Sequence, residues 1–269
     1  MSLRIVTFNI RHGEGLSGRI DLEAQAELLR ALHADAVFLQ EVDVGSRRTG
    51  GVDQARALAE MAGFPYHAFG RCRDCQGGSY GNAILSRFRP AEVANALIAT
   101  PDPLRPRMWR GSPILLEQRG ILRMSVEADG ETVHLLCSHF GFVPEERPPA
   151  ARFLLDLIRP LNGTIVAGGD LNVQEEDAEE LRLLSEVLTD RALVSDPVNM
   201  PEGMFTPART FPADSPRHRL DYLFFRGAFV PTGTAVVPTQ TSDHLPLVVD
   251  LVACPKAGPA GVAARAGLR

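Results

Sequence analysis

Lysine is almost missing from this chain of 269 residues: one of its 28 basic residues is a lysine, Lys256, and the others are arginines. The 33 acidic residues outnumber the basic ones and give a formal net charge of −5. This balance excludes a strongly basic protein that coats nucleic acid without regard to sequence. Codon usage in a GC-rich genome is the simpler explanation of the arginine excess, but guanidinium also suits phosphate, so a local anion site stays open.

Cysteines and long apolar runs are also scarce. Four cysteines are too few for a disulfide framework in a chain of this length. Cys72 and Cys75 form a CxxC pair, but no second pair stands at zinc-binding spacing, so we expect unpaired loop thiols, with a redox disulfide as the alternative. No run of about 18 apolar residues occurs, which excludes a membrane-spanning helix. The N-terminal stretch lacks the features of a signal peptide, so we expect a cytoplasmic protein.

Short strand-like runs alternate with helical ones along the chain. The apolar pattern predicts strands at 3–10, 36–42, 82–86, 121–128, 132–140, 164–172, 220–225 and 245–252, and helices at 22–33, 53–62 and 148–158. Asp129 and Gly130 predict a hairpin. The mixed order indicates one layered α/β domain over residues 1–254, rather than a parallel barrel or a doubly wound sheet. Residues 255–269, rich in Gly, Pro and Ala, are expected to form a disordered tail.

Residues 100–113 form an irregular stretch with four prolines, three arginines and the only tryptophan. One interpretation is a rigid surface loop. The other is a lid over a site, because functional residues concentrate on irregular segments. In that case Arg105, Arg107 and Arg110 would meet an anion, and Trp109 would meet an apolar or ring-bearing group.

Polar side chains fall at the ends of six predicted strands, where α/β domains usually assemble their sites. They are Asn9, Gln40 with Glu41, His139, Asp170 with Asn172, Asp221, and Asp243 with His244. Carboxylate and amide oxygens suit a hard cation such as Mg²⁺ or Mn²⁺. Two histidines beside carboxylates suit proton transfer or the stabilisation of an oxyanion. The combination indicates metal-assisted hydrolysis of a phosphoester.

Seven blocks of the sequence resemble the endonuclease/exonuclease/phosphatase superfamily and occur in the order in which that family has them. The resemblance covers residues 3–252. The blocks are TFNI (7–10), LQEVD (39–43), YGNAILSR (80–87), SHFG (138–141), GGDLN (168–172), RLDYLF (219–224) and SDHLP (242–246). The stretches FNIRHGEG (8–15) and RRTGGVDQ (47–54) look most like the small bacterial metal-dependent hydrolases of that superfamily.

The resemblance implies a four-layer α/β sandwich, in which two mostly antiparallel mixed sheets pack face to face with helices outside. It also implies a site for Mg²⁺ or Mn²⁺. Glu41 would be the main metal carboxylate, with Asn9 nearby through a direct or water-mediated contact and Asp243 at the same ion. Asp170 would activate or orient the attacking water, and Asn172 would help to hold that water or the phosphate.

The remaining implied roles concern the phosphate. His244, held in position by Asp221, would contact the scissile phosphate. His139 would stabilise the phosphate or assist the leaving group, and Asn82 would support the phosphate site from its strand. Four further side chains are candidate substrate contacts outside the family pattern, with a solvated or structural role as the alternative: Tyr80, Arg119, Arg47 and Arg48.

Three functions remain open at this point. The favoured one is a metal-dependent phosphoesterase that acts on a small molecule, or on a lipid head group, although 6% aromatic residues and polar loops make the lipid variant the weaker one. The second is a nuclease or an abasic-site repair endonuclease of the same superfamily, which the absence of a basic stripe disfavours. The third is a binding module without catalysis. The sequence leaves the oligomeric state open.

Overall fold

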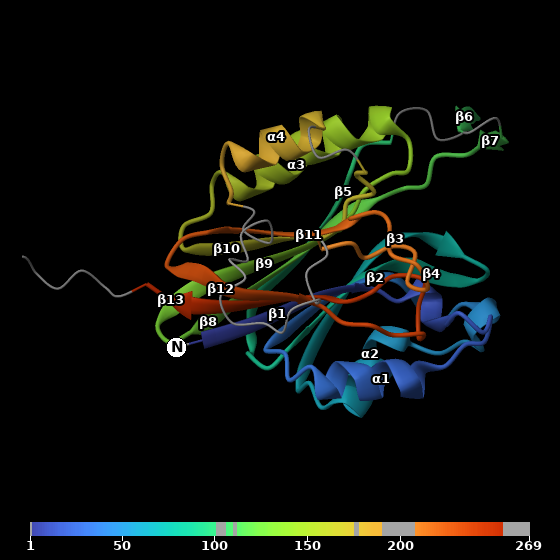
Figure 1. Cartoon of the computed structure of the whole chain (residues 1–269), viewed down its shortest axis with the longest axis horizontal. Helices are drawn as coiled ribbons and strands as arrows, with labels where there is room; N and C mark the ends of the chain where they lie inside the picture. Colours follow the sequence, from blue (N-terminus) through green and yellow to red (C-terminus); the bar gives the residue numbers. More distant parts are fainter. Residues whose placement is uncertain (1, 101–105, 110–111, 175–177, 190–207, 255–269) are drawn as a thin grey trace, which may run out of the picture.

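A computed structural model describes residues 2–100, 106–109, 112–174, 178–189 and 208–254 (Figure 1). In spatial order, the six-stranded sheet holds β12 (Phe229–Val236), β13 (Leu247–Ala253), β1 (Ser2–Asn9), β2 (Ala36–Val44), β4 (Gly78–Ser86) and β3 (Tyr66–Cys75). The five-stranded sheet holds β11 (Asp221–Arg226), β10 (Thr164–Asp170), β9 (Glu131–His139), β8 (Gly120–Ala128) and β5 (Pro90–Leu97). In both sheets most neighbouring strands are antiparallel.

Helices cover the outer faces of both sheets. The α-helices are α1 (Leu22–Ala31), α2 (Gln54–Ala62), α3 (Arg147–Ile158) and α4 (Glu179–Ser185), and the short 3-10 turns are η1 (Arg11–Gly13), η2 (Arg47–Thr49) and η3 (Pro144–Glu146). Figure 1 shows α1 and α2 below the sheets and α3 and α4 above them. The predicted four-layer sandwich is therefore confirmed.

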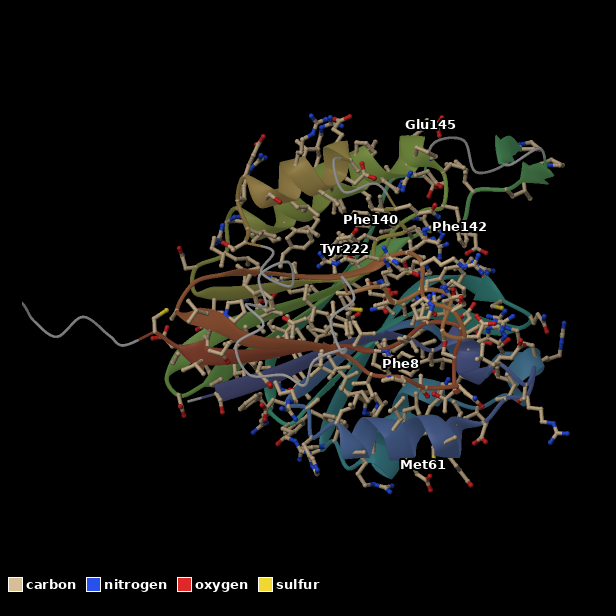
Figure 2. The ribbon with its side chains drawn as sticks, in the orientation of Figure 1. Phe8, Met61, Phe140, Phe142, Glu145 and Tyr222 are labelled. Atoms are coloured by element: carbon tan, nitrogen blue, oxygen red, sulfur yellow. The ribbon has the colours of Figure 1, made fainter. Side chains whose placement is uncertain are left out.

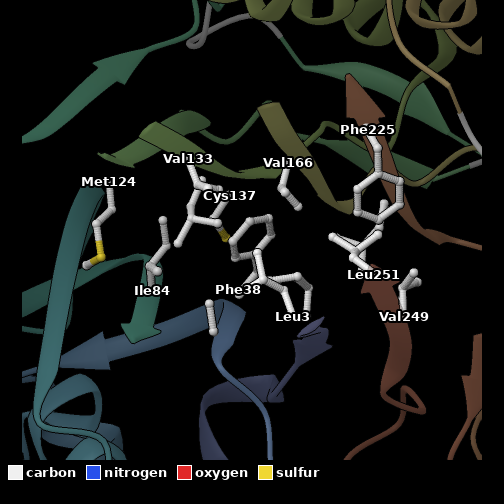
Figure 3. Packing of buried hydrophobic residues seen from close by; sticks show 14 of the residues in the cluster. Leu3, Phe38, Ile84, Met124, Val133, Cys137, Val166, Phe225, Val249 and Leu251 are labelled. Atoms are coloured by element: carbon white, nitrogen blue, oxygen red, sulfur yellow. The ribbon is translucent and has the colours of Figure 1, made fainter. Parts of the chain in front are cut away.

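Three apolar clusters hold the four layers together. The central cluster packs the inner faces of the two sheets against each other, for example Phe38 of β2 against Val166 of β10 (Figure 3). A second cluster, which includes Phe8, joins the six-stranded sheet to α1 and α2. A third cluster, which includes Phe140 (Figure 2), joins the five-stranded sheet to α3 and α4. Both sheets are thus buried on two faces, which explains the continuous apolar runs of their central strands.

The predicted helix ends follow from local chemistry. Asp21 caps α1, because its side chain accepts a hydrogen bond from the backbone N–H of Ala24 over 2.9 Å. Asp53 caps α2 in the same way, and Gly63 ends α2 in the left-handed conformation that glycine adopts without strain. The hairpin at Asp129 and Gly130 is present between β8 and β9.

Each sheet contains one parallel pair of strands, and these two pairs bring the polar strand ends together. In the first pair Asn9 of β1 stands beside Gln40 of β2, and in the second His139 of β9 stands beside Asp170 of β10. Asp221 pairs with Asp170 from the antiparallel neighbour β11. Since β1 also packs against β10, the carboxyl ends of both pairs meet at one end of the sandwich.

Several elements differ from the sequence expectation. Strands β3, β5 and β12 were not predicted, and Cys72 and Cys75 lie buried on β3 rather than on a loop, although both are unpaired thiols as expected. Within residues 100–113 the described parts form a small hairpin of β6 (Arg107–Trp109) with β7 (Ser112–Ile114). The lid hypothesis stays a prediction, because Arg105, Arg110 and the side chains of Arg107 and Trp109 lie outside the described part of the chain. The predicted tail at 255–269 lies outside it too.

Candidate active site

Asp170 lies at the centre of the site, where its side chain is 1% exposed. Its Oδ2 accepts a hydrogen bond from Nδ2 of Asn9 over 2.9 Å, and lies 3.4 Å from Nε2 of His139 and 3.6 Å from Nε2 of His244. Its Oδ1 accepts from the backbone N–H of Asn172 over 3.0 Å. Burial raises the pKa of Asp170 above its ordinary value, and the opposing charge of His244 limits that rise. A raised pKa makes this carboxylate a stronger base than an ordinary aspartate.

His244 approaches Asp170 from the loop before β13 and is held by Asp221 behind it. Its Nδ1 lies 2.9 Å from Oδ2 of Asp221, and its ring packs against that of Phe211 at a centroid distance of 4.9 Å. Burial disfavours the charged imidazolium, but the carboxylates of Asp221 and Asp170 outweigh it and raise the pKa of His244 to about 10. The predicted pairing of Asp221 with His244 is present, and the imidazole is a cation at neutral pH.

His139 lies beside Asp170 on the neighbouring strand β9 and has a different environment from that of His244. Its Nδ1 lies 3.2 Å from Nη1 of Arg119, and its Nε2 lies 3.2 Å from Nδ2 of Asn172. Burial, followed by the positive charges of Arg119 and His244, holds the pKa of His139 well below its usual value. Two imidazoles with different charge states therefore flank one carboxyl group.

Glu41 reaches the site through a bulge in β2. The pairing of β2 with β4 shifts between Leu39 and Val42, and Glu41 adopts a left-handed backbone with φ of +60°. Such a conformation costs a residue with a side chain about 1–3 kcal/mol. It turns the carboxylate toward Asn9, whose Nδ2 donates to Oε1 of Glu41 over 3.1 Å. The strain thus serves to aim this side chain.

Buried glutamine and serine side chains position the loops around the site. Gln25 of α1 donates from Nε2 to the backbone oxygens of Ile10 and Thr241 over 2.9 and 2.7 Å. The Ser242 hydroxyl donates to the backbone oxygen of Asn9 over 2.7 Å and to Oδ1 of Asp243 over 3.3 Å. The loop that carries Asp243 and the end of β1 are therefore fixed to each other.

Part of the site borders a cavity of about 270 Å³, but neither His139 nor Asp221 lines it. Its lining comprises Glu41, Phe142, Arg147, Asp170, Asn172, Gln174, Phe211, Leu220, Asp243 and His244. The three carboxylates on this wall are hard oxygen donors and suit Mg²⁺ or Mn²⁺ in kind. Among the described residues, however, no three His, Cys, Asp or Glu side chains converge as a closed metal site.

The residue-level metal assignment stays a prediction. Asn9 directs its amide N–H groups at Glu41 and Asp170, while its Oδ1 accepts from the backbone N–H of Arg11 over 3.0 Å. Nε of Arg11 also lies 3.6 Å from Oδ2 of Asp243. An incomplete protein shell is typical of Mg²⁺, which binds through one or two carboxylates together with substrate phosphate and water. Glu41 and Asp243 can contribute such carboxylates.

The predicted substrate contacts lie at varying distances from this centre. Asn82 donates to the backbone oxygen of Gly120 over 2.9 Å, so its amide ties β4 to β8. Arg48 makes a paired hydrogen bond to Asp43 over 2.7 and 2.8 Å, and Arg47 is exposed on η2. None of these three predicted contacts lines the cavity described above. Their proposed contact with substrate therefore stays untested.

Tyr80 and Arg119 connect to the site through His139. Nη1 of Arg119 lies 3.4 Å from the hydroxyl oxygen of Tyr80, and the guanidinium of Arg73 stacks 4.6 Å from the centre of the tyrosine ring. Both Tyr80 and Arg119 are buried, at 4% and 5% exposure. Arg119 thus lies behind the imidazole rather than in the wall of the cavity.

Sequence reasoning did not assign roles to several side chains around the site. Arg11 and His12 lie in the block FNIRHGEG, and both have left-handed backbones, with φ of +47° and +45°. His12 places Nδ1 4.0 Å from Oε2 of Glu41. Phe142 and Phe211 line the cavity. The block FNIRHGEG could have identified His12 as a site residue. For Phe142, the only signal in the sequence was its position three residues after His139.

The model of the endonuclease/exonuclease/phosphatase family matches residues 6–244, which span all of these site elements. The chain belongs to the endonuclease/exonuclease/phosphatase family. Members of this family are hydrolases that act on phosphoester bonds.

Three individual proteins illustrate the likeness. The uncharacterized protein YbhP of Escherichia coli (strain K12) is 26% identical over 267 residues, covering 93% of this chain and 96% of that protein. The endonuclease/exonuclease/phosphatase of Beutenbergia cavernae has a similar structure, with a TM-score of 0.72 at 24% identity over 94% of this chain and 72% of that one. The mannosyl-6-phosphatase Bt3783 of Bacteroides thetaiotaomicron gives 0.68 at 18% identity over 93% and 99%. Both structures share the fold.

Proposed function

We propose that this chain is a divalent-metal-dependent phosphoesterase that hydrolyses a phosphodiester of a small molecule or lipid head group by attack of water. One observation carries the proposal. Asp170, whose pKa is raised by burial, lies between an imidazolium and a neutral imidazole on the wall of a cavity that also exposes Glu41 and Asp243. A base with a pKa near the working pH is the most effective one.

Each side chain has a distinct task in this reaction. Asp170 accepts the proton of the attacking water, which the amide of Asn172 helps to orient. The imidazolium of His244 donates to a phosphoryl oxygen and stabilises its growing negative charge, while Asp221 holds the ring in place. Mg²⁺ or Mn²⁺ held by Glu41 and Asp243 would supply Lewis-acid polarisation of the phosphoryl group.

The arginines around the site favour a small substrate over a nucleic acid. In the described part of the chain, the arginines nearest the site are engaged by carboxylates of the protein: Arg11 by Glu14, Arg48 by Asp43, Arg73 and Arg119 by Glu117, and Arg147 by Glu180. An engaged guanidinium cannot replace the counterions of several phosphates at once. A cavity of about 270 Å³ accommodates one phosphoryl group with a small substituent.

The cellular compartment and the presence of a membrane-spanning helix are questions separate from the substrate. None of the described helices has the length and apolarity to cross a bilayer. We propose the cytoplasm as the compartment, because Cys72, Cys75 and Cys137 are unpaired thiols buried in the fold, and reducing conditions preserve such thiols.

A substrate panel tests the proposal. Purified protein with Mg²⁺ or Mn²⁺ is given p-nitrophenyl phosphate, bis(p-nitrophenyl) phosphate, glycerophosphocholine, supercoiled plasmid and an abasic-site duplex at low salt, with Asp170→Asn as the control for contaminating activity. Metal-dependent hydrolysis of the small diesters is the expected result. Efficient cleavage of the plasmid or duplex would establish the nuclease alternative instead. Lack of turnover on every ester by folded, metal-supplied protein would favour a binding module.

A further inference from the structure

The two imidazoles beside Asp170 differ in what lies behind them. Asp221, an acceptor, contacts Nδ1 of His244, whereas Arg119, a donor, contacts Nδ1 of His139 over 3.2 Å. An arginine side chain carries only N–H groups and cannot accept a hydrogen bond. Nδ1 of His139 must therefore accept, and the single proton of the neutral ring lies on Nε2.

The second ring nitrogen of His139 points into the catalytic centre. Nε2 lies 3.4 Å from Oδ2 of Asp170. Nδ2 of Asn172 lies 3.2 Å from Nε2 and donates one of its two N–H groups to the backbone oxygen of Phe140 over 3.0 Å. Because Nδ1 of His139 accepts, a neutral ring cannot also accept at Nε2 from the other N–H group. The proton on Nε2 is thus directed at the carboxylate of Asp170, where a substrate oxygen can replace that carboxylate as its acceptor.

The position of Arg119 is determined by three neighbouring side chains, of which Phe142 also lines the cavity. Its Nη1 lies 3.2 Å from Oε2 of Glu117 and 3.4 Å from the hydroxyl of Tyr80, and its guanidinium lies 5.8 Å from the centre of the Phe142 ring. Arg119 is 5% exposed. Because it is buried and engaged on the far side of His139, it is not placed to bind the substrate itself.

We propose that Arg119 is a positioning residue that fixes His139 as a neutral imidazole with its proton on Nε2, so that this histidine donates a hydrogen bond to a phosphoryl oxygen without transferring its proton. The effect of Arg119 on catalysis rests on the proposed function, but the protonation state of the His139 ring does not. The charged groups that face the ring are Arg119, Asp170 and His244. Two of these are cations, and they oppose a second proton on His139.

The two histidines therefore divide the work at one phosphate. His244 contributes a positive charge that Asp221 balances. His139 contributes a directed N–H without a charge, so the net charge of the site stays low while a dianionic transition state is bound. The two histidines are therefore not interchangeable acids. Without Arg119, the ring of His139 could adopt either tautomer or become charged.

Nitrogen NMR of protein labelled with ¹⁵N-histidine tests the inference without any substrate. In the wild type, the His139 signals, assigned by their loss in His139→Gln, are expected to report the Nε2–H tautomer without titration between pH 5.5 and 8. Arg119→Gln is expected to give mixed tautomers and a titration within that range. The matched control is Arg73→Gln, because Arg73 contacts the same Tyr80 ring and Glu117 carboxylate but leaves the Arg119 contact with His139 in place.

The possible results distinguish failure of this inference from failure of the proposed function. An Nδ1–H tautomer or a charged His139 ring in the wild type would overturn the inference, and so would an unchanged His139 spectrum in folded Arg119→Gln. If that variant does not fold, Arg119→Lys retains a donor, and the wild-type spectrum alone still decides. If the protein hydrolyses a diester, Arg119→Gln should lower kcat by about 100-fold with little change in KM. A correct tautomer in an inactive protein would instead refute only the proposed function.

Discussion

Nδ1 of His244 donates a hydrogen bond to Oδ2 of Asp221 over 2.9 Å, and the two side chains are 5% and 0% exposed. This pair explains why an imidazole stays charged inside the protein, where burial alone would neutralise it. It also fixes the ring so that Nε2 faces Asp170 at 3.6 Å. The charge at the centre of the site therefore depends on a residue that does not line the cavity.

Replacement of Asp221 tests this dependence. Asp221→Asn keeps the size of the side chain but removes the charge that stabilises the imidazolium, so the pKa of His244 should fall. We expect kcat to drop by about 100-fold or more, and the alkaline limb of the pH–rate profile to move to lower pH. The measurement is kcat/KM between pH 5.5 and 10 on the best diester. An alkaline limb that stays in place would show that His244 is not the group that titrates there.

The same pair predicts how stability depends on pH. Unfolded His244 loses its proton near its ordinary pKa of 6.5, whereas the folded protein retains it to about 10. The stabilisation is fully present below pH 6.5 and is lost as the pH rises toward 10, by up to about 1.4 kcal/mol per unit. Urea denaturation at pH 6, 7.5 and 9 should show this decline, and His244→Gln should flatten it. A decline of equal slope in that variant would assign it to other groups.

Glu41 should control metal binding. Glu41→Gln retains the hydrogen bond that Asn9 can share with it but removes a carboxylate, so the increase in Tm that Mn²⁺ causes in the wild type should shrink or disappear. Asp250→Asn is a matched control, because Asp250 lies on β13 and pairs with Arg4 away from the site. Thermal unfolding with and without Mn²⁺, and after treatment with EDTA, measures the effect. An undiminished metal-induced shift in Glu41→Gln would remove Glu41 from the metal site.

Gly169 holds β10 close to β9 just before Asp170. A Cβ atom there would lie 1.9 Å from the backbone oxygen of Ser138, and the φ of +135° strains any other residue. We expect Gly169→Ala to lower the free energy of unfolding by about 1–3 kcal/mol and to reduce activity through displacement of Asp170. Chemical denaturation checks the first effect. Gly130→Ala, at a turn with open space around it, provides the comparison for the φ penalty alone.

The strand ends made the centre of the site predictable. Asn9, His139 and Asp170 each end an apolar strand, and parallel pairing places such ends at one edge. Glu41 follows Gln40, the last residue of β2 that pairs with β1. Strands β3 and β5 were not predicted because they lack a regular apolar pattern. Strand β5, with the sequence PAEVANAL, is an edge strand that is largely exposed, so it shows little apolar alternation. In β3, a bulge near Cys72 interrupts the period on which such predictions depend.

The contact between Arg119 and His139 was harder to predict because it depends on register. Ile121 of β8 pairs with Ser138 of β9. Continuing that register by one residue places Gly120 opposite His139, and Arg119 next to it. The turn at Asp129 and Gly130 sets the pairing register of β8 and β9, so this register could be derived from the sequence. An isolated arginine before a strand, however, gave no reason to derive it. The left-handed backbone of Glu41 had no such signal.

The most direct test of the account is hydrolysis of a small phosphodiester by Asp170→Asn beside the wild type, at saturating Mn²⁺ and across pH 5.5–9. Metal-dependent turnover in the wild type is expected, with an acidic limb in the pH–rate profile that reports the proton of Asp170. A loss of about 1,000-fold or more is expected in the variant, because the base is removed while Asn9 and the histidines remain. A folded Asp170→Asn protein that retains wild-type turnover and the same acidic limb would contradict the central role of Asp170.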